Sequence, residues 1–209
     1  MKIKLRTIIR IALLLFSAVT LVLVLKKPAP VAQRQTPAAI AANAESFQQK
    51  MEQFSQEVQQ VAPAGGSYQA ASSTAQPKAE VHLNSQEVGA ALAQATGTAE
   101  LTPNSNVGSG APAIKEQSVS FEGDVVHGQF LAEVAGKDVW VTISGHLGAK
   151  DGYATFDPTE FKVGDMSVPV SMVNPALQKK LAEQRDRLKL PDYIGELRVQ
   201  NGELVIQQK

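Results

Sequence analysis

Hydrophobic and polar residues follow three different patterns along this chain of 209 residues. The stretch Ile8–Leu25 is almost continuously apolar, with Arg10 as its one charge. Between Ile40 and Val61 apolar residues recur at alternating spacings of four and three, which is the pattern of an amphipathic helix. After Ile114 apolar and polar residues alternate, as in strands with one covered face. The chain therefore combines a hydrophobic N-terminus, a helix and a β-rich domain.

The hydrophobic N-terminus predicts a membrane anchor. A helix needs about 20 apolar residues to cross a bilayer, with a lower limit of about 17, and Ile8–Leu25 spans 18. A cleaved signal peptide is the alternative. However, Lys26 and Lys27 follow the apolar run directly, and small-x-small sites such as Ala39-Ile40-Ala41 lie about 14 residues too late for cleavage. We therefore favour a retained single-pass helix, whose length is marked by Ile8, Ile11, Leu15, Val19 and Leu25.

Flanking charge sets the expected orientation of this helix. Four basic residues precede its uninterrupted apolar part, and two follow it directly. The positive-inside rule then places the N-terminus in the cytoplasm and the rest of the chain on the other side. We expect a protein of the bacterial inner membrane whose C-terminal domain lies on the outer, periplasmic side.

Composition divides the remainder of the chain. After the anchor and its basic flank (residues 1–27), we expect a proline-broken tether at 28–37 and the amphipathic helix at 38–62. An Ala-, Ser- and Gly-rich flexible linker follows at 63–80. Residues 81–209 are expected to form one small α+β domain with a loop at 102–112. In that domain, Asn84 and Glu87 have the spacing of a capping box at the start of a short helix.

The amphipathic helix has a narrow apolar seam, formed by Ile40, Ala44, Phe47, Met51, Phe54, Val58 and Val61. A short coiled coil that joins two anchored chains is one interpretation. The other is a helix that lies on the protein's own domain or projects from the membrane. Three heptads are the lower limit for predicting a coiled coil, so the second interpretation is favoured.

The β-rich domain reads as a series of hairpins. Turn residues such as Glu122-Gly123-Asp124 separate alternating segments at regular spacing, and Asn201-Gly202 suits a type I′ turn in the last hairpin. Alternation puts Val126, Gly128, Phe130 and Ala132 on one face with Val139, Val141, Ile143 and Gly145. The opposite face carries His127, Gln129, Glu133, Thr142, Ser144 and His146, and is expected to be mostly polar, with Leu131 and Trp140 as exceptions.

A helix is expected after this sheet. Gly164 allows a turn after a strand ending near Val163, and Leu177, Leu181 and Leu188 form an apolar stripe. Pro175 either kinks the helix or restarts it after Asn174, which is a suitable N-cap. The predicted fold class is therefore α+β: a single N-terminal transmembrane helix, then an antiparallel meander sheet packed on a long helix.

Candidate chemistry is sparse. The absence of cysteine excludes disulfides and thiolate catalysis, and from Ile114 onward 11 Lys or Arg face 14 Asp or Glu, which gives −3 and argues against nucleic-acid binding. No phosphate-binding loop or hydrolase motif is present. His127 and His146 fall on the polar face near turn acids, where exposed histidines are more common than metal ligands. We expect no catalytic residue, no metal and no cofactor.

The apolar sheet face is the remaining candidate site. Gly128, Ala132 and Gly145 place small residues among larger ones. Such residues either leave space for an acyl chain or allow a helix to pack closely. The candidate ligand face consists of Val126, Phe130, Val141, Ile143, Leu177 and Leu181.

Short motifs across residues 81–207 give the chain a family resemblance. A strand with Asp151, Gly152, Phe156 and Pro158 runs through Gly164 and Val168-Pro169 into a helix, and Leu190-Pro191 introduces a hairpin with Gly202 in its turn. This order resembles the bacterial YpmS-like and LmeA-like membrane-anchored proteins, relatives of the tubular lipid-binding superfamily. The resemblance implies a long helix wrapped by a curved antiparallel sheet, a lipid groove and no catalysis.

Two functions follow as expectations. The first is an exported, membrane-anchored envelope protein whose α+β domain binds lipid between sheet and helix. The alternative is a structural or assembly partner in an envelope complex, with a homodimer formed through the helix at 40–61 or contacts to another envelope protein. Both attach the chain to the membrane, and neither involves nucleic acid.

Overall fold

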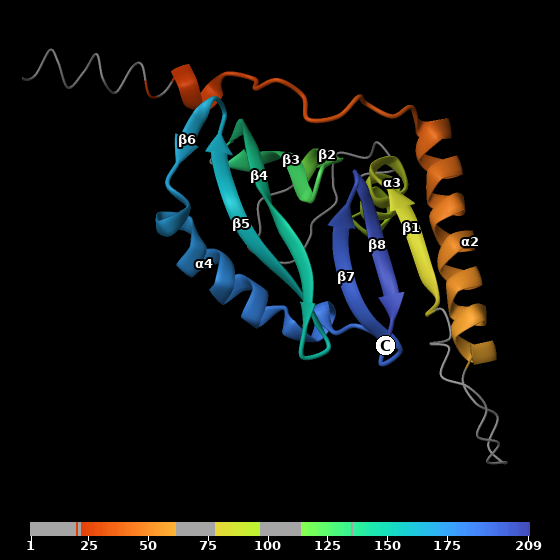
Figure 1. Ribbon diagram of the computed structural model, residues 1–209. Coiled ribbons are helices and arrows are strands. Elements are labelled where there is room, and N and C mark those ends of the chain that lie inside the picture. The colour runs from red at the N-terminus through yellow and green to blue at the C-terminus, as the bar shows by residue number, and fades with distance from the viewer. Residues whose placement is uncertain (1–19, 21, 62–77, 97–113, 135) are drawn as a thin grey trace, which may run out of the picture.

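The computed structural model describes residues 20, 22–61, 78–96, 114–134 and 136–209, and these form two antiparallel sheets with helices (Figure 1). The five-stranded sheet has the order β2 (Ile114–Glu122), β3 (Val125–Val134), β4 (Lys137–Lys150), β5 (Tyr153–Val163) and β6 (Met166–Val168). The three-stranded sheet has the order β1 (Glu80–Asn84), β8 (Glu203–Gln208) and β7 (Ile194–Gln200).

Helices lie on opposite sides of these sheets. In Figure 1, α2 (Pro37–Val61) stands beside β1, whereas α4 (Val170–Glu183) runs beside β5. The short helix α3 (Ser85–Thr96) follows β1 directly and contacts both α2 and β2. The 3-10 helix η1 (Arg185–Leu188) connects α4 with the last hairpin.

The core lies between α2 and the three-stranded sheet. Phe54 and Val58 of α2 pack with Val81 and Leu83 of β1, together with buried residues of β7 and β8. Phe54 is 1% exposed and Leu83 is fully buried. The apolar seam of α2 therefore faces the chain's own domain, as the second interpretation of the seam predicts.

The final hairpin has the predicted turn. Asn201 and Gly202 both have positive φ angles, 54° and 80°, as a type I′ turn requires. Antiparallel pairing of β7 with β8 follows from this turn, and β8 then pairs with β1. The hairpin prediction is confirmed, whereas the pairing with β1 was not expected.

The predicted fold class is wrong in two respects. There are two sheets, since the hairpin of β7 and β8 pairs with β1 and does not extend the other sheet. Residues 80–84, assigned to a linker and the start of a helix, form this strand β1, whose alternate residues Val81 and Leu83 are buried. In addition, the five-stranded sheet does not pack on a long helix. Helix α4 lies mainly against the strand β5 of that sheet, and none of its residues is buried. Its stripe is narrow, and Pro175 inside the helix removes one backbone hydrogen-bond donor.

The predicted anchor and loops lie largely outside the described residues. Among the residues that the structure describes, no helix combines the length and apolar character needed to cross a bilayer. Residues Ile8, Ile11, Leu15 and Val19 lie outside the described residues, as do residues 63–77 of the linker and the loop at 102–112.

A buried carboxylate joins α2 to β1 and α3. Asn84 Oδ1 accepts hydrogen bonds from the amides of Gln86 and Glu87, while Glu87 Oε2 accepts one from the Asn84 amide, all at 2.9 Å. This is the predicted capping box. From α2, Lys50 Nζ lies 2.8 Å from Glu87 Oε1, and the Ser46 hydroxyl donates to the same oxygen at 2.6 Å.

The environment of Glu87 stabilises its charged form. Burial acts to raise the pKa of Glu87, which is 3% exposed, but hydrogen bonds from Lys50, Ser46 and the Asn84 amide outweigh it, so the pKa lies below its ordinary value. A lowered folded-state pKa contributes stability above the unfolded pKa of about 4.3, and that stability is lost as pH falls through the folded value.

We predict that Glu87→Gln lowers the free energy of unfolding at pH 7 by about 2–3 kcal/mol, because the ammonium of Lys50 loses its charged partner. Urea denaturation at pH 7 and pH 3 measures this. The difference between wild type and variant should shrink at pH 3, which lies below the unfolded-state pKa, so that part of the stabilisation from the lowered folded-state pKa of Glu87 is lost. Glu52→Ala on the exposed side of α2 is the control and should change stability by less than about 0.5 kcal/mol. A difference that is the same at both pH values would contradict the account.

We also predict that Phe54→Ala lowers the free energy of unfolding by about 3–5 kcal/mol, because it leaves a cavity in the core. The exposed Gln53→Ala is the control. The denaturation midpoint should not depend on protein concentration, since α2 packs within its own chain. A midpoint that rises with concentration would instead indicate that the seam joins two chains.

Candidate functional site

Three of the predicted ligand-face residues form one half-buried surface on the five-stranded sheet. Cross-strand pairing places Phe130 opposite Val141, and Val141 opposite Val163. Ile143 pairs with Phe161 on the same face. All five side chains are half buried, so this surface is not sealed as a core is. We call these residues (Phe130, Val141, Ile143, Phe161 and Val163) the apolar face.

Val126, also predicted for the ligand face, belongs elsewhere. It packs with Phe121 and Leu147 against the core beside the three-stranded sheet. Strand β4 runs beside β7 here, so this end of the five-stranded sheet is covered by protein. The part of the sheet that remains available is the end nearer to β6.

The glycines of the apolar face do not leave empty space. A Cβ atom at Gly128 would lie 3.0 Å from the ring of Phe130, and one at Gly145 would lie 2.8 Å from the ring of Phe156. The backbone of Asp157 also crowds Gly145, where a register shift interrupts the pairing of β4 with β5. Here the small residues accommodate neighbouring phenylalanines, so a ligand would lie on these rings and not beneath them.

Both ends of helix α4 are attached to the five-stranded sheet. Its first residue follows β6 after Pro169, and β6 pairs with β5. Beyond its other end, the Leu190 amide donates to the Gly152 carbonyl at 2.9 Å, and the Arg185 guanidinium lies 4.2 Å from the centre of the Tyr153 ring. Between these points Leu177 and Leu181 are half buried, and no residue of α4 is buried.

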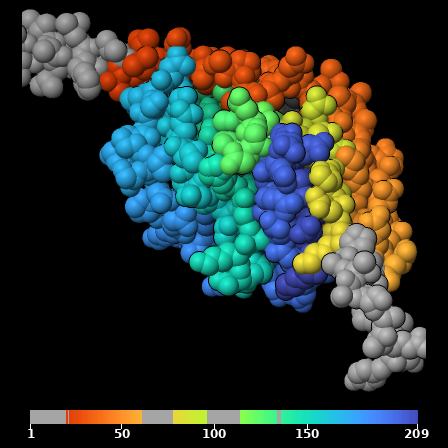
Figure 2. Space-filling model, in the orientation of Figure 1, coloured from red at the N-terminus to blue at the C-terminus, as the bar shows by residue number. Residues whose placement is uncertain are grey.

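The centre of the polar face of the five-stranded sheet is buried, and the element that covers it is not the amphipathic helix but the segment before it. Gln129, Thr142 and Ser144 are 3%, 7% and 2% exposed. Residues 22–35, here called the N-terminal strap, lie against this face, where Gln129 Nε2 donates to the Ala29 carbonyl at 3.0 Å. Lys27 Nζ lies 5.4 Å from the centre of the Trp140 ring. Figure 2 shows the strap as a continuous band from β6 to α2.

Both ends of the strap are also fixed. Lys26 Nζ forms a 2.6 Å ion pair with Asp165, whose amide donates to the Leu23 carbonyl at 2.9 Å. At the other end Arg34 pairs with Glu116 at 2.6 Å. Sequence reasoning missed this arrangement, because polar residues without periodicity indicate a tether. Pro28 and Pro30 could have indicated an extended segment, since proline favours the extended backbone that the strap adopts.

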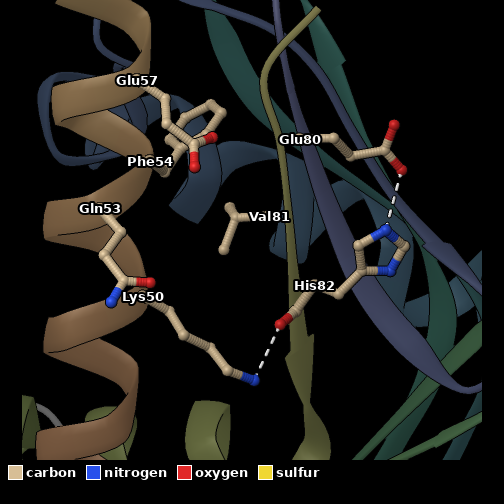
Figure 3. Close-up of a pocket in the computed structure, with 7 residues that line it drawn as sticks. All are labelled: Lys50, Gln53, Phe54, Glu57, Glu80, Val81 and His82. Atoms are coloured by element: carbon tan, nitrogen blue, oxygen red, sulfur yellow. Dashed lines mark hydrogen bonds and ion pairs between the residues drawn. The ribbon is translucent and has the colours of Figure 1, made fainter.

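A pocket of about 160 Å³ lies between α2 and β1 (Figure 3). Phe54 and Val81 line it together with Lys50, Gln53, Glu57, Glu80 and His82. The Lys50 ammonium group in this pocket already has protein partners, because it donates to the His82 carbonyl at 3.0 Å and pairs with Glu87. The His82 ring points away toward Glu80. The polar groups of this pocket therefore join α2 to β1.

One pair with catalytic potential emerges from the sheet register. His127 lies opposite Ser144, and His127 Nδ1 is 2.8 Å from the Ser144 hydroxyl. Ser144 is only 2% exposed, so a substrate does not reach its oxygen. His146 lies 3.5 Å from Asp124 at an exposed turn. Within the described residues, no group of three or more His, Asp or Glu side chains is arranged to hold a metal ion.

Comparison of the chain with protein-family models, with curated proteins and with solved structures gave no match. The resemblance to the YpmS-like and LmeA-like proteins stays a prediction.

Proposed function

We propose that this protein is a membrane-anchored, exported envelope protein whose domain binds a lipid acyl chain on the apolar face beside α4. It acts without catalysis, and its ligand is held by apolar contact. The proposal combines the hydrophobic stretch Ile8–Leu25 with the half-buried surface formed by Phe130, Val141 and Ile143.

One observation carries the proposal: α4 is fixed at both ends yet has no buried residue along its length. A helix with an apolar stripe ordinarily buries that stripe against the core. Here Leu177 and Leu181 stay half buried, as do Phe161 and Val163 on the strand that α4 contacts. Two partly covered apolar surfaces side by side suit an elongated apolar ligand that completes the packing of both.

The energetics also fit an acyl chain. Removing one CH₂ group from water contributes about 0.8 kcal/mol, so a chain that is only partly covered still gains several kcal/mol. No charged side chain belongs to the apolar face, so binding requires no desolvation of a charge there.

Self-association through residues 40–61 is less favoured. The seam residues Phe54 and Val58 are 1% and 7% exposed within the chain's own core. A homodimer through this seam would first have to remove α2 from that core and break the contacts of Lys50 with Glu87.

We predict that the full-length wild type, extracted from membranes in mild detergent, retains phospholipid in native mass spectrometry. Leu177→Asp should reduce the lipid-bound fraction at least ten-fold, because it places a charge in the apolar stripe of α4. Ala176→Asp adds the same charge at the neighbouring exposed position and should leave binding unchanged. Circular dichroism checks that both variants are folded. A wild type free of lipid, or equal lipid retention by both variants, would contradict the proposal.

A further inference from the structure

We infer that the β5–β6 end of the domain rests directly on the surface of the bilayer that holds the anchor, with the N-terminal strap fixing it there. This inference rests on the proposed membrane attachment of Ile8–Leu25, and it does not require lipid capture by the apolar face. Residues 28–37 then do not act as a tether that lets the domain move away from the membrane.

The first support is that little free chain separates the hydrophobic segment from the domain. The hydrophobic segment ends in a helical turn, Val22–Leu25, in which the Lys26 amide donates a hydrogen bond to the Val22 carbonyl at 3.0 Å. Within this same turn, the Leu23 carbonyl already accepts a hydrogen bond from the Asp165 amide. The end of the hydrophobic segment is thus attached to the β5–β6 turn.

Gly164 makes this attachment specific. Its φ angle is +59°, in the region that favours glycine. A Cβ atom at this position would collide with the backbone carbonyls of Leu23 and Val24. Gly164 therefore allows the backbone conformation of the β5–β6 turn. The absence of a side chain also lets the backbone of the hydrophobic segment contact this turn directly.

The exposed apolar side chains of the described residues gather at this end. The large hydrophobic residues that are most exposed are Val22 at 64%, Leu25 at 44% and Met172 at 73%. Val22 and Leu25 lie in the helical turn beside β6, and Met172 lies in the first turn of α4, which follows β6. Figure 1 shows these elements on one side of the molecule. An exposed apolar group next to a hydrophobic segment suits contact with lipid.

The polar groups at this end suit the membrane–water interface. Lys26 is 62% exposed while it pairs with Asp165, and Lys27 lies over Trp140. Tryptophan and lysine are both favoured at this interface, where an apolar body meets a polar surface. The occupant of the surface is therefore the lipid bilayer, and an acyl ligand would reach α4 from that same bilayer.

The position of Trp140, the chain's single tryptophan, provides the test. Full-length protein is reconstituted into phosphatidylcholine vesicles whose acyl chains are brominated close to the head group, and bromine quenches tryptophan fluorescence only at short range. We expect the fluorescence of Trp140 to fall by about half relative to vesicles without bromine. A matched reporter is Trp140→Phe/Tyr153→Trp. Trp140 of β4 lies beside the end of β5 at Val163, where its carbonyl accepts a hydrogen bond from the Gly164 amide, and Tyr153 begins β5 at the other end. Because a strand rises about 3.3 Å per residue, that end lies about 33 Å away, and we expect no quenching there.

Flotation of the vesicles separates the two claims. Protein that floats with the vesicles and shows equal quenching, or none, at both reporter positions would overturn this inference while leaving the membrane attachment intact. Protein that does not float would overturn the attachment and this inference with it. Strong quenching of Trp140 alone supports both, whether or not lipid binds at the apolar face.

Discussion

The polar row Gln129, Thr142 and Ser144 is the constraint on which the arrangement of this protein depends. These side chains are buried on the five-stranded sheet, and a buried polar group must find hydrogen-bond partners to avoid a large cost. The strap supplies one through the Ala29 carbonyl, while Thr142 and His127 supply others within the sheet. Because the strap occupies the polar face, it leaves the apolar face uncovered for the proposed ligand. The same strap brings the hydrophobic segment to the β5–β6 turn, so one set of contacts supports both the proposed binding surface and its proposed orientation.

Stability and proposed function are located in different halves of the molecule. The largest fully buried side chains, Phe54, Leu83 and Val205, belong to α2 and the three-stranded sheet, and Glu87 connects these elements to α3. The apolar face has no such side chain, and its neighbour α4 has no buried residue. A rigid core beside a loosely covered surface allows α4 to adjust to a ligand without disturbing the rest of the fold, since weakly packed elements are the first to open.

Local features were predictable from the sequence, and long-range ones were not. Asn201-Gly202, the Asn84–Glu87 capping box and the strand alternation around Phe130 are each determined by neighbours in the chain, and the structure has all three. Strand β1 was missed because five residues between a linker and a helix give too short a pattern, and its partner β8 lies more than a hundred residues away. The sequence did not predict that the Phe130 ring occupies the space beside Gly128, because alternation gives the face on which a side chain lies but not the direction of its ring. The strap was missed because its contacts are made by backbone carbonyls and single charged side chains.

The central claim is that an acyl chain lies between α4 and the apolar face, and a fluorophore on α4 tests it most directly. The chain has no cysteine, so Leu177→Cys can carry a single environment-sensitive bimane group, with the exposed Lys179→Cys as the matched position. Addition of phospholipid to delipidated full-length protein should shift the bimane emission at position 177 to shorter wavelength and leave that at position 179 unchanged. An unchanged spectrum at 177, or equal shifts at both positions, would contradict the claim.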